Sequence, residues 1–312
     1  MDLCSISNLV YFLGLAVLVK GLAKFGFFVN RWFVRKPHDV HERYGKDSWI
    51  LVTGATSGIG LGICKYAASD KNLNVVLVGR NSDKLKKSEQ EVKEANPKIK
   101  TKTLVLDFNV STDLEYYYKA LEPVKDLDIS IIVNNAGAVT IGGLEEVTQE
   151  MLKEMTETNM HGLTVLTKMF ADRFAKRATR SAIVNVSSVG GYFPAPISAH
   201  YSATKAFVTS FTNGFGYEVK DKIDVLCHCP AGVSSAMSAF KISFDTASPR
   251  DCAFVIFRDL GYERENMPII VQEASQLALS IMGWISGSLL LAIAKMAVTN
   301  EHKGILERRK NL

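Results

Sequence analysis

The stretch Trp49-Ile50-Leu51-Val52-Thr53-Gly54-Ala55-Thr56-Ser57-Gly58-Ile59-Gly60 decides the fold that this sequence predicts. An apolar run of strand length, 48–52, ends in a glycine-rich turn, and the apolar residues of 59–68 then recur at helical spacing. Small residues between a strand and a helix let the backbone approach a pyrophosphate at the helix N-terminus. The stretch therefore predicts a strand–turn–helix unit that binds a dinucleotide, in preference to a purely structural turn.

Strand and helix patterns keep alternating after this unit. We expect strands at 74–78, 103–106, 129–133, 182–186, 224–229 and 268–271, and helices at 82–95, 112–121, 149–175 and 203–219. A βαβ period implies a parallel sheet with helices on both faces. The predicted fold class is α/β, a doubly wound, mostly parallel, seven-stranded Rossmann sheet, and the polar stretch 36–47 is the candidate linker before it.

Composition excludes several classes of protein. The 312 residues are 47% hydrophobic and 22% charged, which argues against a disordered or low-complexity chain. The formal charge of +5 is mild, and no basic stretch is interleaved with aromatics, so nucleic acid is not expected as a partner. The five cysteines are too scattered for a disulfide scaffold. Cys227-His228-Cys229 could suggest a metal site, but without a second ligand cluster we interpret these residues as part of a buried strand and expect no metal.

Both ends of the chain are apolar. No charge occurs from 3 to 19, the apolar pattern continues to 29, and Arg31, Arg35 and Lys36 then form the basic flank typical of the cytoplasmic side of a membrane. A helix packed on the protein's own core is the alternative. The uncharged segment 274–294 could be a second transmembrane helix, an interfacial hairpin or a lid over an apolar pocket.

These patterns predict a membrane anchor at 1–35, a Rossmann-type domain at 36–273 and a C-terminal hydrophobic segment with a basic tail at 274–312. We therefore expect membrane-associated helices at the N- and C-termini. The tail, 307–312, loosely resembles the dibasic retrieval signals of endoplasmic-reticulum proteins, or is simply a solvated basic end.

The end of the second strand indicates which dinucleotide is bound. Val78-Gly79-Arg80 carries no carboxylate where NAD-binding folds usually place an acid for the ribose hydroxyls. An arginine can pair with a 2′-phosphate through its planar guanidinium, so NADP(H) is favoured over NAD(H), with a solvated Arg80 as the alternative. Asp107, just after the third strand, caps the adenine pocket or starts a turn.

A second group of residues is suited to proton transfer. Tyr201 and Lys205 are four positions apart on a predicted helix, and therefore on one face. A neighbouring ammonium favours the phenolate and lowers the tyrosine pKa. Ser188 lies at the end of the fifth strand, where an open α/β sheet presents groups to a ligand.

These residues carry a resemblance that covers nearly the whole chain. The 53–60 turn, Asn134-Asn135-Ala136-Gly137, Asn159, Ser188, Tyr201 and Lys205 together resemble the short-chain dehydrogenase/reductase superfamily. More narrowly, 44–46, 54–56, 187–188, 194–196 and 201–207 resemble the microsomal very-long-chain 3-oxoacyl-CoA reductase and 17-beta-hydroxysteroid dehydrogenase group.

The resemblance implies roles for the site residues. Tyr201 would protonate the carbonyl oxygen as hydride arrives, Ser188 would orient that oxygen, Lys205 would lower the Tyr201 pKa and hold the nicotinamide ribose, and Asn159 would fix a water. The motifs and the resemblance together give as cofactor-binding residues Gly54, Thr56, Ser57, Gly58, Ile59, Gly60, Arg80, Asp107, Asn135, Tyr201, Lys205, Pro230, Val233 and Ser235. Ser235 stands where the family usually has threonine.

The resemblance implies an NADPH-dependent oxidoreductase in the endoplasmic-reticulum membrane, with its catalytic domain facing the cytosol. The preferred reaction is reduction of 3-oxoacyl-CoA in very-long-chain fatty acid elongation, with a homodimer and an elongation complex as expected assemblies. Met237, Phe240, Ile242 and Phe244 suit a greasy ligand, either acyl chain or steroid. A dehydrogenase of 17-beta-hydroxysteroids or other lipid carbonyls therefore stays open, as does a non-catalytic nucleotide-binding membrane scaffold.

Overall fold

The computed structural model describes residues 3–234, 243–289, 291–293, 295–296 and 299. The chain divides into two units, Met1–Pro37 and His38–Leu312. Each unit is described by itself below.

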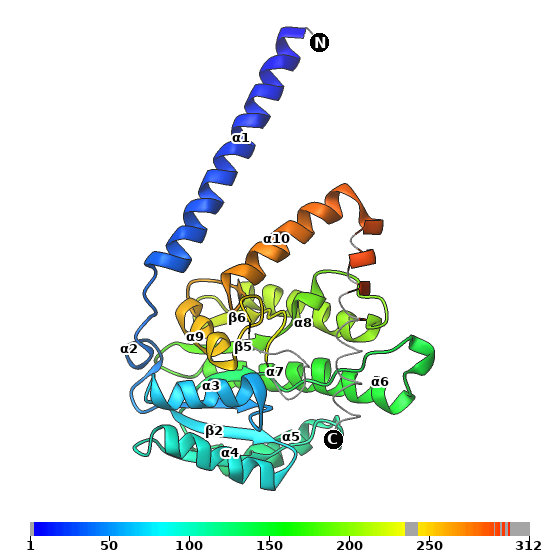
Figure 1. The fold of residues 1–312 in the computed structure, drawn as a ribbon. Coiled ribbons are helices and arrows are strands. Elements are labelled where there is room, and N and C mark those ends of the chain that lie inside the picture. Colours follow the sequence, from blue (N-terminus) through cyan, green and yellow to red (C-terminus); the bar gives the residue numbers. More distant parts are fainter. Residues whose placement is uncertain (1–2, 235–242, 290, 294, 297–298, 300–312) are drawn as a thin grey trace. The chain divides into compact units, whose positions relative to one another are not determined.

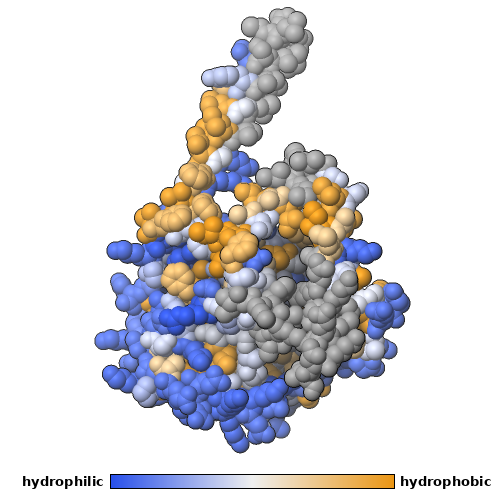
Figure 2. Space-filling view, viewed as in Figure 1, coloured by the Kyte–Doolittle hydropathy of each residue, from blue (hydrophilic) through white to orange (hydrophobic). Residues whose placement is uncertain are grey.

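The first unit is a helical segment. Helix α1, Leu3–Val29, continues as a π-helical turn, η1, at Asn30–Val34. Its large exposed apolar side chains are Tyr11, Phe12, Leu15, Leu18, Val19, Leu22, Phe25, Phe27, Phe33 and Val34, and hydrophobic residues are visible along the helix in Figure 2. Within the described part of the chain, no helix combines the length and apolar character needed to cross a bilayer, so transmembrane spans in 3–29 or 274–294 are not confirmed.

The second unit is built on one seven-stranded sheet (Figure 1). Its strands are β1 Trp49–Thr53, β2 Asn74–Gly79, β3 Thr101–Val105, β4 Ile129–Asn134, β5 Ser181–Val186, β6 Ile223–His228 and β7 Glu265–Asn266. They lie in the order β3-β2-β1-β4-β5-β6-β7, and every neighbouring pair is parallel. The predicted doubly wound parallel sheet is confirmed.

Helices cover both faces of this sheet. α3 Gly58–Ser69, α4 Ser82–Ala95 and α9 Pro249–Asp259 pack on one face, and α5 Leu114–Leu121, α7 Gly162–Phe174 and α8 Ala199–Glu218 pack on the other. The unit also contains α2 Val40–Tyr44, α6 Gln149–Thr156 and α10 Ile270–Ile285. Successive strand residues enter opposite cores: Ile50 and Val52 pack with α3, α4 and α9, whereas Leu51 packs with α5 and α7. This alternation is why the central strands are apolar throughout.

Two predictions about local structure are wrong. The β-branched run 268–271 was expected to be a strand, but the last strand is β7 and α10 begins at Ile270. Pro268 has no N–H to donate to a ladder, which ends the sheet before the apolar run. The expected linker, 36–47, contains α2, whose Tyr44 is buried and donates to Asp224 Oδ2 at 2.8 Å, so much of this stretch belongs to the folded domain.

The strand order fixes where a ligand can bind. From β1 the chain proceeds outward through β2 and β3, then returns to place β4 on the other side of β1. In an open α/β sheet the crevice outside the carboxyl ends of the strands at such a reversal is the ligand site. Thr53 and Asn134 end these two strands.

Candidate active site

The glycine turn between β1 and α3 needs glycine at three of its positions. Gly54 and Gly58 have φ of +65° and +54°, in the left-handed region that favours glycine. A Cβ on Gly60 would lie only 2.4 Å from the Gly54 carbonyl oxygen. The turn therefore brings bare backbone to the N-terminus of α3, where the N–H groups of a helix attract phosphate.

Hydrogen bonds join this turn to the end of β4. Asn135 Nδ2 donates to the Thr53 and Gly54 carbonyls at 2.9 and 3.3 Å. Thr53 Oγ1 accepts from the backbone N–H groups of Asn135 and Ala136, both at 3.0 Å. These bonds hold the two sides of the crevice at a fixed separation.

A cavity of about 260 Å³ lies beyond the end of β3. It is lined by Phe108, Asn109, Val110, Ser111, Thr112, Lys153 and Glu157. Asp107, just before it, accepts from the Asn109 N–H at 3.0 Å and so forms the predicted turn. Among the described residues, Asn109 Oδ1 and Glu157 Oε2 are buried without a hydrogen-bond partner, and such acceptors suit the amino group of an adenine.

Arg80 follows β2 and is exposed. Its Nη1 lies 2.7 Å from Glu154 Oε1 of α6. Thr56, in the glycine turn, lies close by, because a Cβ on Gly79 would be 3.1 Å from Thr56 Cγ2. The predicted residues Gly54 to Gly60, Arg80, Asp107 and Asn135 thus line one continuous edge of the sheet, and they fit a dinucleotide with a 2′-phosphate.

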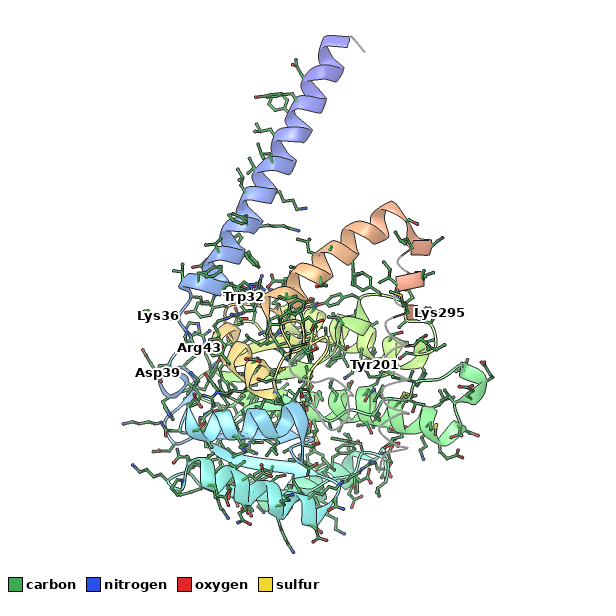
Figure 3. The ribbon with its side chains drawn as sticks, viewed as in Figure 1. Trp32, Lys36, Asp39, Arg43, Tyr201 and Lys295 are labelled. Carbon is green, nitrogen blue, oxygen red and sulfur yellow. The ribbon has the colours of Figure 1, made fainter. Side chains whose placement is uncertain are left out.

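Ser188 and Tyr201 both lie beside Gly190. Ser188 caps the short helix η5, Val189–Gly191, by accepting from the Gly190 N–H at 3.1 Å. Tyr201, labelled in Figure 3, comes from the first turn of α8. A Cβ on Gly190 would lie 3.5 Å from Ser188 Oγ and 3.8 Å from Tyr201 Cε1. The hydroxyl-bearing side chains therefore come together although 12 residues of loop and helix separate them in sequence.

Lys205 places its ammonium behind the tyrosine. Nζ lies 5.7 Å from the centroid of the Tyr201 ring and donates to the Val186 carbonyl at 3.0 Å. The side chain is only 5% exposed. Burial lowers the pKa of Lys205 to about 8, against the opposing effect of the Cys227 and Cys229 thiols. A cation at this place favours the ionised form of a nearby phenol.

Asn159 links the start of α8 to the loop after β4 through hydrogen bonds. It lies in a π-helical turn, η4 Glu157–His161, between α6 and α7, and such turns are frequent at functional sites. Its Nδ2 donates to the Ala138 carbonyl and to Thr204 Oγ1, at 2.9 and 3.0 Å, and its Oδ1 accepts from the Ala138 N–H. A Cβ on Gly137 would lie 3.4 Å from Asn159 Oδ1 and 3.6 Å from Lys205 Nζ, so the two predicted side chains are neighbours.

The loop after β6 is described only in part. The Pro230 carbonyl accepts from the Val189 N–H at 3.0 Å, which ties this loop to Ser188 and η5. Val233 pairs with Ala247. Ser235, Met237, Phe240 and Ile242 lie outside the described residues, and Phe244 is exposed.

Cys227, His228 and Cys229 are buried as predicted, the first two in β6 and Cys229 directly after its end. His228 Nδ1 is 2.7 Å from Asn266 Oδ1, and burial lowers the pKa of His228 to about 4.

Sequence reasoning missed several supporting residues. Thr53 was seen only as the start of the turn, and Thr204 only as part of a motif. Ser187 Oγ donates to the Lys205 carbonyl at 2.8 Å and contacts Thr209 Oγ1 at 2.8 Å, which fixes α8 against β5. The sequence could have indicated Thr53 and Ser187, because each is a polar residue at the end of an apolar strand.

The arrangement suits reduction of a carbonyl or oxidation of an alcohol. A phenol can move a proton, a neighbouring hydroxyl can bind the reacting oxygen, and an ammonium can set the phenol's acidity. Hydride chemistry itself needs a nicotinamide cofactor, and the adjoining crevice has the helix N-terminus and the buried acceptors that suit its phosphates and its adenine.

Comparisons with known proteins agree with this geometry. The profile of the family described as short chain dehydrogenase matches residues 48–244. A very-long-chain 3-oxoacyl-CoA reductase of Coccidioides immitis (strain RS) is 36% identical over 215 residues, covering 67% of this chain and 60% of the relative. Very-long-chain 3-oxoacyl-CoA reductase-B of Danio rerio is 29% identical over 254 residues, covering 78% of this chain and 76% of the relative.

Solved structures share the fold. A short-chain dehydrogenase from Sphingobium yanoikuyae in complex with NADPH is 27% identical, with a TM-score of 0.64 over 76% of this chain and 95% of that one. A 7beta-hydroxysteroid dehydrogenase, 23% identical with a TM-score of 0.71 over 82% of this chain and 99% of that one, is similar in fold.

Proposed function

The chain belongs to the short-chain dehydrogenase family, and from this premise we propose that it is an NADPH-dependent reductase of very-long-chain 3-oxoacyl-CoA. The observation that carries the proposal is the meeting of Ser188, Tyr201, Lys205 and Asn159 at the carboxyl edge of the sheet, next to the glycine turn. The names of the relatives support the acyl-CoA substrate.

In the proposed reaction the chain's residues handle the oxygen and the proton. When bound, NADPH supplies the hydride for the substrate carbonyl carbon. Ser188 Oγ would donate a hydrogen bond to the carbonyl oxygen and hold it beside the phenol. Tyr201 would transfer its proton to that oxygen as negative charge develops, and the Lys205 ammonium would stabilise the phenolate left behind. The product is the 3-hydroxyacyl-CoA.

The cofactor assignment rests on Arg80 and the residues around it. An exposed guanidinium at the end of β2, with a glycine and no carboxylate before it, suits the 2′-phosphate. The relative from Sphingobium yanoikuyae, in complex with NADPH, supports the same choice.

Membrane association in the endoplasmic reticulum, with the catalytic domain in the cytosol, is part of the proposal. It is supported by the exposed apolar side chains of α1, by the basic residues Arg31, Arg35 and Lys36 that follow them, and by Leu277 of α10, which is also exposed. Flotation of the full chain with phosphatidylcholine vesicles tests the membrane association. The wild type should float with the vesicles, and replacing Leu15, Leu18 and Leu22 by serine should release the protein from them.

The substrate is tested by following NADPH oxidation in detergent with a long-chain 3-oxoacyl-CoA and, separately, a 17-ketosteroid. We expect faster turnover of the acyl-CoA, and NADH should be a poor substitute for NADPH. A preference for the steroid would overturn the substrate assignment. Binding of NADPH without oxidation by either ketone would indicate a scaffold.

A further inference from the structure

Arg80 has an acidic partner that comes from a distant part of the chain. Glu154 is 74 positions away in sequence, yet its Oε1 lies 2.7 Å from Arg80 Nη1. Their side chains are 65% and 40% exposed, so the pair stands in solvent and can open at little cost. Arg80 itself is held in place because the next residue, Asn81, caps α4 by accepting from the Lys84 N–H.

The pair lies beside the cavity that we assign to the adenine. Lys153 and Glu157, on either side of Glu154 in the same helical segment, form one wall of that cavity. Residues 108–112, which also line the cavity, follow β3, which is the neighbour of β2. Arg80 therefore reaches from the end of β2 to the helix that forms a cavity wall.

We propose that Glu154 is a specificity-determining residue, which holds the Arg80 guanidinium in the cofactor-free protein and competes for it with the 2′-phosphate of NADPH. This inference rests on the proposed use of NADPH. The phosphate prevails in the competition because it carries nearly two negative charges and three acceptor oxygens, whereas the carboxylate carries one charge. A cofactor without a 2′-phosphate leaves the Arg80–Glu154 pair intact and gains nothing from Arg80.

Glu154 thereby weakens the binding of NADPH and leaves the binding of NADH unchanged. Binding of NADPH must separate the ion pair, and the released carboxylate stays near the phosphate and repels it. Removing the charge of Glu154 should strengthen binding of NADPH alone, by about two- to fivefold, the range expected for one exposed ion pair.

Titration calorimetry with 2′,5′-ADP and 5′-AMP, which differ by the 2′-phosphate, tests this without turnover. Glu154→Gln should bind 2′,5′-ADP about two- to fivefold more tightly than the wild type does and bind 5′-AMP equally well. Glu150→Gln removes the same charge one helical turn earlier, where the side chain is also exposed, and should have the smaller effect. In an Arg80→Ala background, Glu154→Gln should give a smaller gain, because only the repulsion between the carboxylate and the phosphate is left to remove.

Each other result counts against the inference. Unchanged or weaker binding of 2′,5′-ADP by Glu154→Gln, or the same gain in the Arg80→Ala background, would overturn the role of Glu154 while leaving the NADPH assignment intact. A wild-type protein that binds 2′,5′-ADP no more tightly than 5′-AMP would overturn the cofactor assignment and this inference together.

Discussion

Lys205 offers a replacement that should separate stability from catalysis. Its side chain is 5% exposed, and its Nζ donates to the Val186 carbonyl at 3.0 Å. Burial lowers its pKa from 10.5 to about 8 in the folded, cofactor-free protein. At neutral pH the folded protein therefore contains a buried ammonium whose charged form is less favourable than it is in the unfolded chain.

The sign and size follow from proton linkage. Below pH 8 Lys205 is protonated in both the folded and the unfolded protein. Its buried charge then lowers the free energy of unfolding by the full amount, about 3 kcal/mol for a pKa lowered to about 8. Between pH 8 and 10.5 the unfolded state binds more protons than the folded state, so the contribution of Lys205 to the free energy of unfolding rises with pH. Above this window the destabilisation is gone.

Lys205→Met removes this titration. The change leaves the Val186 carbonyl without its donor, which costs about 1–3 kcal/mol. At pH 7 the two effects nearly cancel, so we expect the variant to be about as stable as the wild type, although it should lose turnover. The free energy of unfolding of the wild type minus that of the variant should rise by about 3 kcal/mol between pH 7 and pH 10.5.

Urea unfolding of both proteins at several pH values in this window measures the difference. Cys64 and Cys252, whose pKa values burial raises, also titrate in alkali but contribute equally to both proteins and cancel. Lys98→Met, at an exposed lysine, is the matched control and should show no such dependence. If the difference in free energy of unfolding between the wild type and Lys205→Met does not change from pH 7 to 10.5, the reasoning is refuted.

Three further changes test other parts of the site and fold. Tyr201→Phe should lower turnover by about 10²–10⁴-fold while leaving the NADPH dissociation constant nearly unchanged, and steady-state kinetics beside fluorescence titration would show whether both hold. Asp224→Asn should lower the free energy of unfolding at pH 7 by about 3–5 kcal/mol, because Asp224 binds Arg43 through a 2.6 Å ion pair at a buried position. Burial raises the pKa of Asp224, but the Arg43 guanidinium outweighs this and holds the pKa below 3.8. The difference in free energy of unfolding between the wild type and Asp224→Asn, measured with urea, should therefore shrink as the pH falls below 3.8. Gly60→Ala should weaken NADPH binding about tenfold or more, since its Cβ would meet the Gly54 carbonyl oxygen at 2.4 Å, and unchanged affinity in a titration would contradict the close-packed turn.

The sheet and the site were predictable because their signals are local. The glycine turn after β1 and the four-residue spacing of Tyr201 and Lys205 each depend on one strand end or one helix face. The apolar runs of the inner strands, buried on both sides, marked the parallel sheet in the same way.

What escaped prediction depends on contacts between distant residues. Tyr44 lies in a polar stretch that looks like a linker, and it is contacts with distant residues, such as its hydrogen bond to Asp224, 180 positions away, that show α2 folded onto the sheet. Glu154 is one of the two acids of α6, and no spacing marks it as the partner of Arg80. The run 268–271 has strand propensity, but Pro268 and the end of β7 decide against it.

The most direct measurement of the central claim follows the hydride itself. The protein would be incubated with a long-chain 3-oxoacyl-CoA and NADPH carrying deuterium at both C4 positions of the nicotinamide, and the acyl-CoA product would be analysed by mass spectrometry. The account predicts a 3-hydroxyacyl-CoA with one deuterium on carbon 3 from the wild type and almost none from Tyr201→Phe. Unlabelled product, or labelled product formed equally well by Tyr201→Phe, would contradict it.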